Sequence, residues 1–212
     1  MLDSEVAEHH VLFGCCRKMS KPVELIFRQV FITIIMALIQ SLKRGRCKMM
    51  NKPWSKVRQM LEEDFLCESL KGRVRYFTTR YRHAHDGTGR VCILIDDIEK
   101  LNMPFQTENE MYAEVYRRKD DSKSLKDWCD EVAGEFHNNG IFEPGDFGVA
   151  LNEYFENSIE QSLNSDDLLV RLLAILDRRT GKRTLERIKP TINDLPEWLQ
   201  YFYNLRLENE NI

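Results

Sequence analysis

The sequence lacks the motifs that most often reveal catalysis or cofactor binding. It contains no Gly-x-Gly-x-x-Gly for a dinucleotide, no Gly-x-Ser-x-Gly for an acyl hydrolase and no Glu-x-x-His for a di-iron bundle. Residues 180–184 look like a phosphate-binding loop, but Leu176 stands where that loop needs its first glycine. We interpret them as a helix C-terminus whose carbonyl groups attract basic side chains. The sequence therefore assigns no reaction and no cofactor.

Cysteine is sparse and unpatterned. The 6 cysteines form no Cys-x-x-Cys pair and have no regular spacing, which fits neither a disulfide framework nor a zinc site. We expect reduced thiols, a cytoplasmic location and no bound metal. The 10 glycines and 6 prolines show no repeats, which argues against fibrous and disordered classes.

Long hydrophobic runs are also missing. The longest, residues 30–39, spans ten residues, whereas a membrane-spanning helix needs roughly 20. Asp3, Glu5 and Glu8 occupy the part of a signal peptide that is normally basic. We therefore expect neither a transmembrane segment nor a secretion signal.

The first 49 residues differ in composition from the rest, and two interpretations remain open. Residues 24–43 would form a peripheral helix on a membrane surface or on a partner, followed by a basic stretch. In the interpretation that we favour, residues 1–49 are a non-native leader. Residues 43–46 before Met49 and Met50 match the translation of a purine-rich ribosome-binding site upstream of a start codon.

Charge separates the two parts further. Residues 1–49 hold 8 basic and 4 acidic residues, which leaves 23 basic and 30 acidic residues in the remainder. A net charge of −7 makes residues 50–212 a poor general binder of nucleic acid. Their length suits a single domain with a sizeable core.

The rest of the chain is organised around a β-hairpin predicted within residues 72–103. Its two arms are rich in β-branched and aromatic residues, and Asp86-Gly87 between them favours a tight turn. The first arm is basic, whereas the second ends in the acidic residues Asp96, Asp97 and Glu99. The hairpin is either isolated or the core of a small antiparallel sheet.

Elsewhere, apolar residues recur at helical spacing and predict about five helices. The expected helices cover residues 51–72, 111–116, 125–138, 146–160, 165–180 and 194–205, with a short link at Leu185 and Ile188 and a break at Pro190. A third strand would explain residues 111–116 equally well. Residues 168–176 are apolar nearly all round, which places their helix at the centre of the bundle.

The basic arm is the feature with the most direct consequence for binding. Arginines interleaved with aromatic residues suit phosphate contacts and base stacking. The predicted anion-binding or nucleic-acid-binding residues are Arg73, Arg75, Arg80, Tyr81 and Arg82. In the alternative, which we favour, these arginines pair with Asp96, Asp97, Glu99 or acidic helix faces of the same molecule.

A weaker candidate is a polar site formed by His83, His85, Asp96 and Asp97. Two histidines two apart on a strand point to one face, but a metal usually needs three or four ligands. The acidic residues resemble a metal-dependent nuclease core, yet that core needs an acid two positions before its lysine, and Ile98 stands there. A solvated strand end explains these acids more simply.

Residues 50–212 resemble an uncharacterised bacterial protein family with no assigned activity. The shared patterns are Trp54-Ser55-Lys56, Ser69-Leu70-Lys71-Gly72-Arg73-Val74, Thr79-Arg80-Tyr81-Arg82, His85-Asp86 with Gly89-Arg90, Leu176-Asp177-Arg178-Arg179, Gly181-Lys182-Arg183, and Trp198 with Phe202-Tyr203 and Leu205-Arg206. The resemblance implies no functional residue and no partner.

We therefore expect an α+β domain in which helices cover one face of a hairpin or small sheet. Its function is unknown. We favour a non-catalytic intracellular binding or regulatory protein with a protein partner. The alternatives are an RNA-binding protein that uses the basic arm and a metal-dependent enzyme with an unrecognised acidic site.

Overall fold

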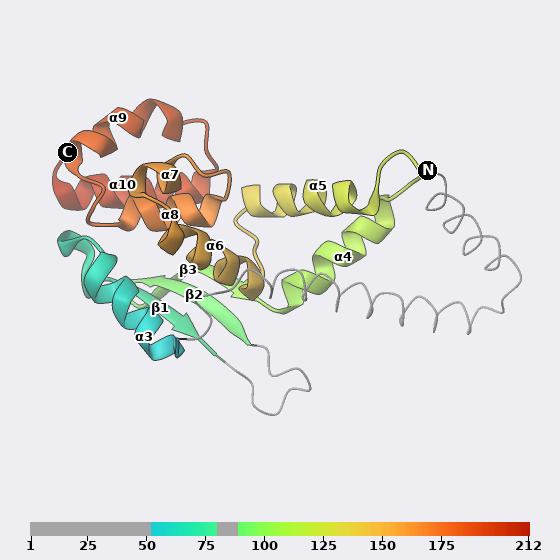
Figure 1. Cartoon of the computed structure of the whole chain (residues 1–212), viewed down its shortest axis with the longest axis horizontal. Helices are drawn as coiled ribbons and strands as arrows, with labels where there is room; N and C mark the ends of the chain where they lie inside the picture. The colour runs from blue at the N-terminus through green and yellow to red at the C-terminus, as the bar shows by residue number, and fades with distance from the viewer. Residues whose placement is uncertain (1–51, 80–88) are drawn as a thin grey trace, which may run out of the picture. The chain divides into compact units, whose positions relative to one another are not determined.

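The protein combines a small sheet with a group of helices, as shown by a computed structural model of the chain (Figure 1). The structure describes residues 52–79 and 89–212, which belong to one compact unit, Cys47–Ile212. These ranges contain eight α-helices and three strands in one antiparallel sheet. The predicted α+β class is confirmed.

The sheet has the strand order β1-β2-β3, with β1 at Val74–Thr78, β2 at Arg90–Ile95 and β3 at Ile98–Pro104. The pairing of β1 with β2 confirms the predicted hairpin, although its Asp86-Gly87 turn lies outside the described residues. The third strand begins directly after the acidic pair. What looked like a solvated strand end is therefore a turn within the sheet.

That turn consists of Asp96 and Asp97, which connect β2 to β3. Their φ angles of 51° and 62° are both left-handed, as a two-residue type I′ hairpin turn requires. Farther along, Ile93 pairs with Leu101 but Leu94 pairs with Glu99, so Lys100 is an extra residue in β3. This β-bulge bends the strand near its start.

Helix α3 spans Trp54–Gln59 and continues as a π-helix over Met60–Phe65, followed by a 3₁₀ turn at Glu68–Leu70. The other helices are α4 Gln106–Arg118, α5 Leu125–Asn138, α6 Pro144–Glu156, α7 Ile159–Leu163, α8 Leu168–Leu176, α9 Lys182–Ile192 and α10 Glu197–Glu210. The first predicted helix is therefore too long, because helical structure stops at Phe65 rather than near Gly72. Residues 111–116 are helical, not a strand.

The helix starts differ in several places from the predicted ones. Helix α6 begins after Glu143, which forms a capping box with Asp146, and Ser158 caps a separate helix, α7. Asp167 rather than Ser165 caps α8, since its side chain accepts hydrogen bonds from the amides of residues 169 and 170. Pro196 rather than Asp194 precedes α10.

The prediction was wrong for residues 181–192, where the structure has a whole helix instead of a link and a break. Gly181 precedes the first turn of α9 and does not end the helix before it. Pro190 lies in the last turn of α9. The misassignment arose because a glycine after an apolar run usually marks a helix end.

Helix α8 lies at the centre of the packing, as its all-round apolar sequence predicts. All of its residues except Leu168 and Arg171 are buried, and it packs against α6, α7 and α10. Across the core, Phe147 of α6 stacks on Tyr76 of β1 with ring centroids 6.1 Å apart. Helices thus cover the sheet face that Tyr76 belongs to.

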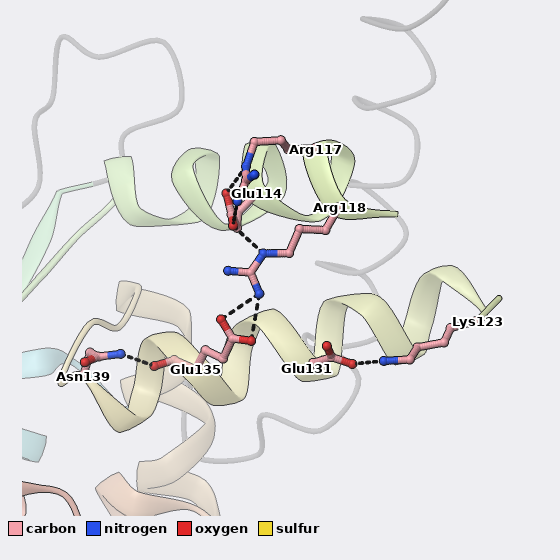
Figure 2. Close-up of polar contacts among 7 residues, drawn as sticks. All are labelled: Glu114, Arg117, Arg118, Lys123, Glu131, Glu135 and Asn139. Atoms are coloured by element: carbon pink, nitrogen blue, oxygen red, sulfur yellow. Dashed lines mark hydrogen bonds and ion pairs between the residues drawn. The ribbon is translucent and has the colours of Figure 1, made fainter. Parts of the chain in front are cut away.

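Helices α4 and α5 pack chiefly against each other (Figure 1). Arg118 of α4 joins them, because its guanidinium group donates to both carboxylate oxygens of Glu135 on α5, each at 2.7 Å (Figure 2). The same guanidinium group donates to Glu114, which also pairs with Arg117. This charge network ties the two helices together at their surface.

Candidate binding face of the sheet

The sheet face to which Tyr76 does not belong carries Arg73 and Arg75 of the predicted anion-binding site. Side chains alternate along β1, so Val74 and Tyr76 are buried whereas Arg75 and Phe77 are exposed. Phe77 is 42% exposed, which is unusual for a large aromatic side chain. We call this surface of Arg73, Arg75, Phe77, Arg90 and Glu99 the outer face.

Arg73 is held firmly at one end of the outer face. Its guanidinium group donates to both carboxylate oxygens of Asp96, at 2.9 and 2.6 Å, and also to Asn209 on α10. The hydrogen bonds from Arg73 lower the pKa of the Asp96 carboxyl, and the same bonds raise the pKa of Arg73. This pair fixes the β2–β3 turn against the end of α10.

Arg75 is held much more loosely. It donates to Asp97 at 2.6 Å, but 55% of the Arg75 side chain and 75% of the Asp97 side chain remain exposed. Ion pairs in such surroundings contribute about 0–1 kcal/mol, because water screens them and two flexible side chains lose freedom. Arg75 is therefore available to another carboxylate at little cost.

Arg90 spans the middle of the outer face. Its guanidinium group donates to both oxygens of Glu99, at 2.9 and 2.6 Å, which is a bidentate pair between β2 and β3. The charges of Arg90 and Glu99 both act on the Cys92 thiol, which is fully buried. Burial raises the pKa of this thiol. The thiolate is therefore disfavoured, and Cys92 serves as a small apolar contact.

The predicted anion site is thus described in part. Arg73 and Arg75 each hold a carboxylate, whereas Arg80, Tyr81 and Arg82 lie outside the described residues. Tyr76, an aromatic residue between Arg75 and Phe77 in the basic arm, is 3% exposed and packs on Phe147. Alternation along the strand is the signal that distinguishes Phe77 from Tyr76.

The polar candidate site is described in part as well. Asp96 and Asp97 occupy the β2–β3 turn with their carboxylates on Arg73 and Arg75, whereas His83 and His85 lie outside the described residues. Within residues 52–79 and 89–212, no group of three or more His, Cys, Asp or Glu side chains is placed to hold a metal ion. No helix in the same ranges is long and apolar enough to cross a membrane.

Asp177 forms a buried polar centre near the end of α8. Its buried carboxylate accepts hydrogen bonds from the Tyr154 hydroxyl and from the Arg179 guanidinium group, the latter at 2.9 and 2.6 Å. Burial and the charge of Asp177 raise the pKa of Tyr154. The Asp177 backbone also bridges to Leu66, and this backbone bridge holds the segment after α8 against the segment after α3.

Arg206 of α10 forms a second buried centre. It is 3% exposed and donates to Ser69, to Glu210 and, at 3.2 Å, to the carbonyl oxygen of Thr180. These bonds join the 3₁₀ turn, the segment before α9 and the last helix. A buried guanidinium group that connects three segments serves to stabilise the fold rather than to bind a ligand.

Family comparison adds to this geometry. The profile of the SF0329 protein family matches residues 53–207. The chain belongs to the SF0329 protein family. No curated protein and no solved structure matches it. The SF0329 match includes all three strands of the sheet and the Asp177 and Arg206 centres, so the outer face and the two buried centres all belong to the family region.

Proposed function

We propose that this SF0329 family member is a non-catalytic cytoplasmic binding protein that recognises another protein through the outer face. The single observation that carries the proposal is the exposed Phe77 ring beside the loosely paired Arg75. Arginine and aromatic side chains are the types most enriched at protein interfaces and at their energetic centres.

Charge favours a protein over a polyanion at this surface. Arg73, Arg75 and Arg90 each have a carboxylate partner on the neighbouring turn or strand, so their positive charges are locally balanced. A polyanion gains most from unbalanced positive charge, because counterion release drives its binding. A protein partner instead gains from burying Phe77 and from a carboxylate that replaces Asp97 on Arg75.

The test is site-specific photo-crosslinking with the full chain. A photoreactive phenylalanine analogue at position 77 should yield a discrete protein adduct in the host cytoplasm. The same analogue at position 141, an exposed apolar position just after α5, is the control. The captured protein, once purified, should bind the chain directly and lose at least about tenfold in affinity with Phe77→Ala but not with Ile141→Ala. An adduct of equal yield from both positions, or none from position 77, refutes the proposal.

RNA binding by the basic arm is the competing proposal, because Arg80 and Arg82 follow β1 directly. It requires retention of the full chain on RNA at low salt and loss of retention on Arg80→Glu with Arg82→Glu. Retention indifferent to salt and to both substitutions removes it. An enzyme with a site at Asp96 and Asp97 would have to release both carboxylates from Arg73 and Arg75 first.

A further inference from the structure

Helix α9 presents the highest density of positive charge in the described part of the chain. Residues 178–189 contain six basic residues and one acidic residue, although the whole chain has a net charge of −3. The exposed basic side chains on and just before this helix form what we call the α9 basic face: Arg178, Lys182, Arg183, Arg187 and Lys189. Figure 1 shows α9 beside α10.

Two arginines of this face differ from the others in how they are paired, whereas its Arg187 pairs with Glu160 and its Lys182 donates to the Glu210 carbonyl oxygen. Within residues 52–79 and 89–212, Arg178 and Arg183 are the arginines whose guanidinium groups have no hydrogen bond, ion pair or ring contact. The remaining described arginines each contact a carboxylate or a carbonyl oxygen. Arg178 and Arg183 are both exposed, so their guanidinium groups are accessible to a ligand.

Stability of the fold does not explain these charges. Arg183 lies in the first turn of α9, where no acidic residue is present, and positive side chains there oppose the helix dipole by about 0.3–1 kcal/mol. The sequence-based interpretation, a helix C-terminus that attracts cations, therefore does not hold. Both Arg178 and Arg183 are exposed.

The chemistry of the face points to one kind of partner. The apolar side of α9 is occupied, since Leu185 and Ile192 are buried in the protein, and the exposed side offers charge without a large apolar anchor. Protein interfaces obtain most of their affinity from buried aromatic and apolar anchors, whereas phosphate contacts need basic side chains alone. Membrane binding by a helix also needs a free apolar side.

We propose that the α9 basic face binds the phosphate backbone of a nucleic acid, independently of sequence. The net negative charge of the remaining surface does not prevent this, because charges beyond about 10 Å are largely screened at moderate ionic strength. With about three contributing basic residues, log affinity should fall with log salt concentration with a slope of about −2 for a single strand. The α9 basic face and the outer face share no residue, so substitutions can test the two proposals independently.

The test measures binding of the full chain to a fluorescent single-stranded RNA of mixed sequence. The salt concentration is varied from roughly 20 to roughly 200 mM, the span over which phosphate contacts weaken. Arg178→Glu with Arg183→Glu should weaken binding at least about tenfold, and Arg178→Lys with Arg183→Lys should retain it, since phosphate contact requires charge. Lys56→Glu with Lys126→Glu changes the net charge equally at exposed sites on α3 and α5 and should leave binding within about twofold. Matching unfolding midpoints show that every variant is folded.

Four outcomes would overturn the proposal. The first is no binding at the lowest salt, and the second is equal weakening by the α9 pair and by the control pair of substitutions. The third is loss of binding with Arg80→Glu and Arg82→Glu but not with the α9 pair. The fourth is tighter binding of polyglutamate than of RNA. The third outcome would assign RNA binding to the basic arm. The fourth would indicate an acidic protein as the partner.

Discussion

Asp177 is a buried side chain that accepts hydrogen bonds from both Tyr154 and Arg179. It is 1% exposed and is neutralised by Arg179, whose guanidinium group also lies over the rings of Phe65 and Tyr154. Removing a buried charge partner leaves other charged or polar groups unsatisfied, and the loss exceeds that of an exposed ion pair.

Substitution of Asp177 should therefore lower stability strongly. We expect Asp177→Ala to reduce the free energy of unfolding by about 2–3 kcal/mol, because it leaves the buried Tyr154 hydroxyl without its partner, whereas Arg179 is 41% exposed and can be solvated. Tyr154→Phe removes one hydrogen bond and should cost about 1–2 kcal/mol. Urea unfolding measures both, and a loss below that of Tyr154→Phe would contradict the central role of Asp177.

The ion pairs of Glu114 determine how acid affects the stability of helices α4 and α5. Hydrogen bonds from Arg117 and Arg118 lower the pKa of Glu114 to about 2 from its usual 4.5 (Figure 2). A lowered pKa in the folded state stabilises the fold above pH 4.5, and this contribution disappears as the pH falls towards 2. Glu114→Gln should lower the unfolding midpoint at pH 7 but match the parent chain near pH 2.

Thermal unfolding midpoints at pH 7, 4.5 and 2 check this expectation. A salt series at pH 7 serves as its control, because added salt screens exposed ion pairs and should shrink the difference between the two chains. A difference that grows as the pH falls would show that Glu114 acts through something other than its two arginines.

At the scale of elements, two glycines at α5 provide a matched pair. Gly134 lies inside the helix, and a methyl group there would meet no atom within 4 Å. Gly140, just after the helix, has a φ angle of +73°, and the methyl group would lie 3.1 Å from the Trp198 ring. The same substitution should therefore act in opposite directions at the two positions.

We expect Gly134→Ala to raise the free energy of unfolding by about 1 kcal/mol, because alanine favours the helix. Gly140→Ala should lower it by about 1–2 kcal/mol through backbone strain and the close ring contact. Thermal unfolding distinguishes the two. Destabilisation by Gly134→Ala would mean that another segment approaches α5 closely at this point.

The β2–β3 turn allows a test of how little its outer ion pair contributes. Asp97 has a left-handed φ angle of 62°, which glycine adopts without strain, and its pair with Arg75 is exposed. Asp97→Gly should therefore stabilise the fold by about 0.5–1 kcal/mol, whereas Asp96→Ala, which breaks the bidentate pair with Arg73, should destabilise it. Urea unfolding of the two variants checks the contrast.

The predictability of elements followed the strength of their local signals. The β1–β2 hairpin and α5 were predictable, because β-branched runs, a capping box at Ser124 and a terminal Asn-Asn-Gly are all local. Strand β3 was missed, because it contains few β-branched residues and its turn uses Asp-Asp instead of Asn-Gly. The partners of the arginines depend on strand register, which no local pattern specifies.

For the whole molecule, the attachment of α4 and α5 predicts uneven stability. The C-terminal end of α5 makes described polar contacts with the remaining helices. They include a hydrogen bond between His137 and Asp146, at 3.1 Å, and one from the Trp198 indole N–H to the His137 carbonyl oxygen, at 3.0 Å. Regions with few buried contacts open locally at lower free energy than the core. We expect α4 and α5 amides to exchange through local opening, and α8 amides through global unfolding.

Hydrogen exchange at graded low urea concentrations measures this difference. Exchange of α8 should accelerate with urea as steeply as global unfolding, whereas exchange of α4 and α5 should depend weakly on urea. Equal protection and equal urea dependence in all three helices would show that the molecule opens as one unit.

The composition of the chain indicates its structural class, but it does not show which part of the surface binds a partner. The arginines of the basic arm are close in sequence, yet Arg73 and Arg75 pair with the two aspartates of the β2–β3 turn. The unpaired arginines lie instead around Gly181, where helix α9 was not predicted. A charge pattern becomes informative when the partner of each charge is known.

Strand β3, at one edge of the described sheet, also affects how copies of the protein behave in a crowded solution. Its bulge at Lys100 bends the backbone, Glu99 and Lys100 are exposed, and Pro104 lacks an N–H group. Stacking of identical strands into fibrils requires a flat, uncharged edge with an unbroken row of donors. Growth of amyloid from this edge of the folded molecule is thus disfavoured by the strand itself.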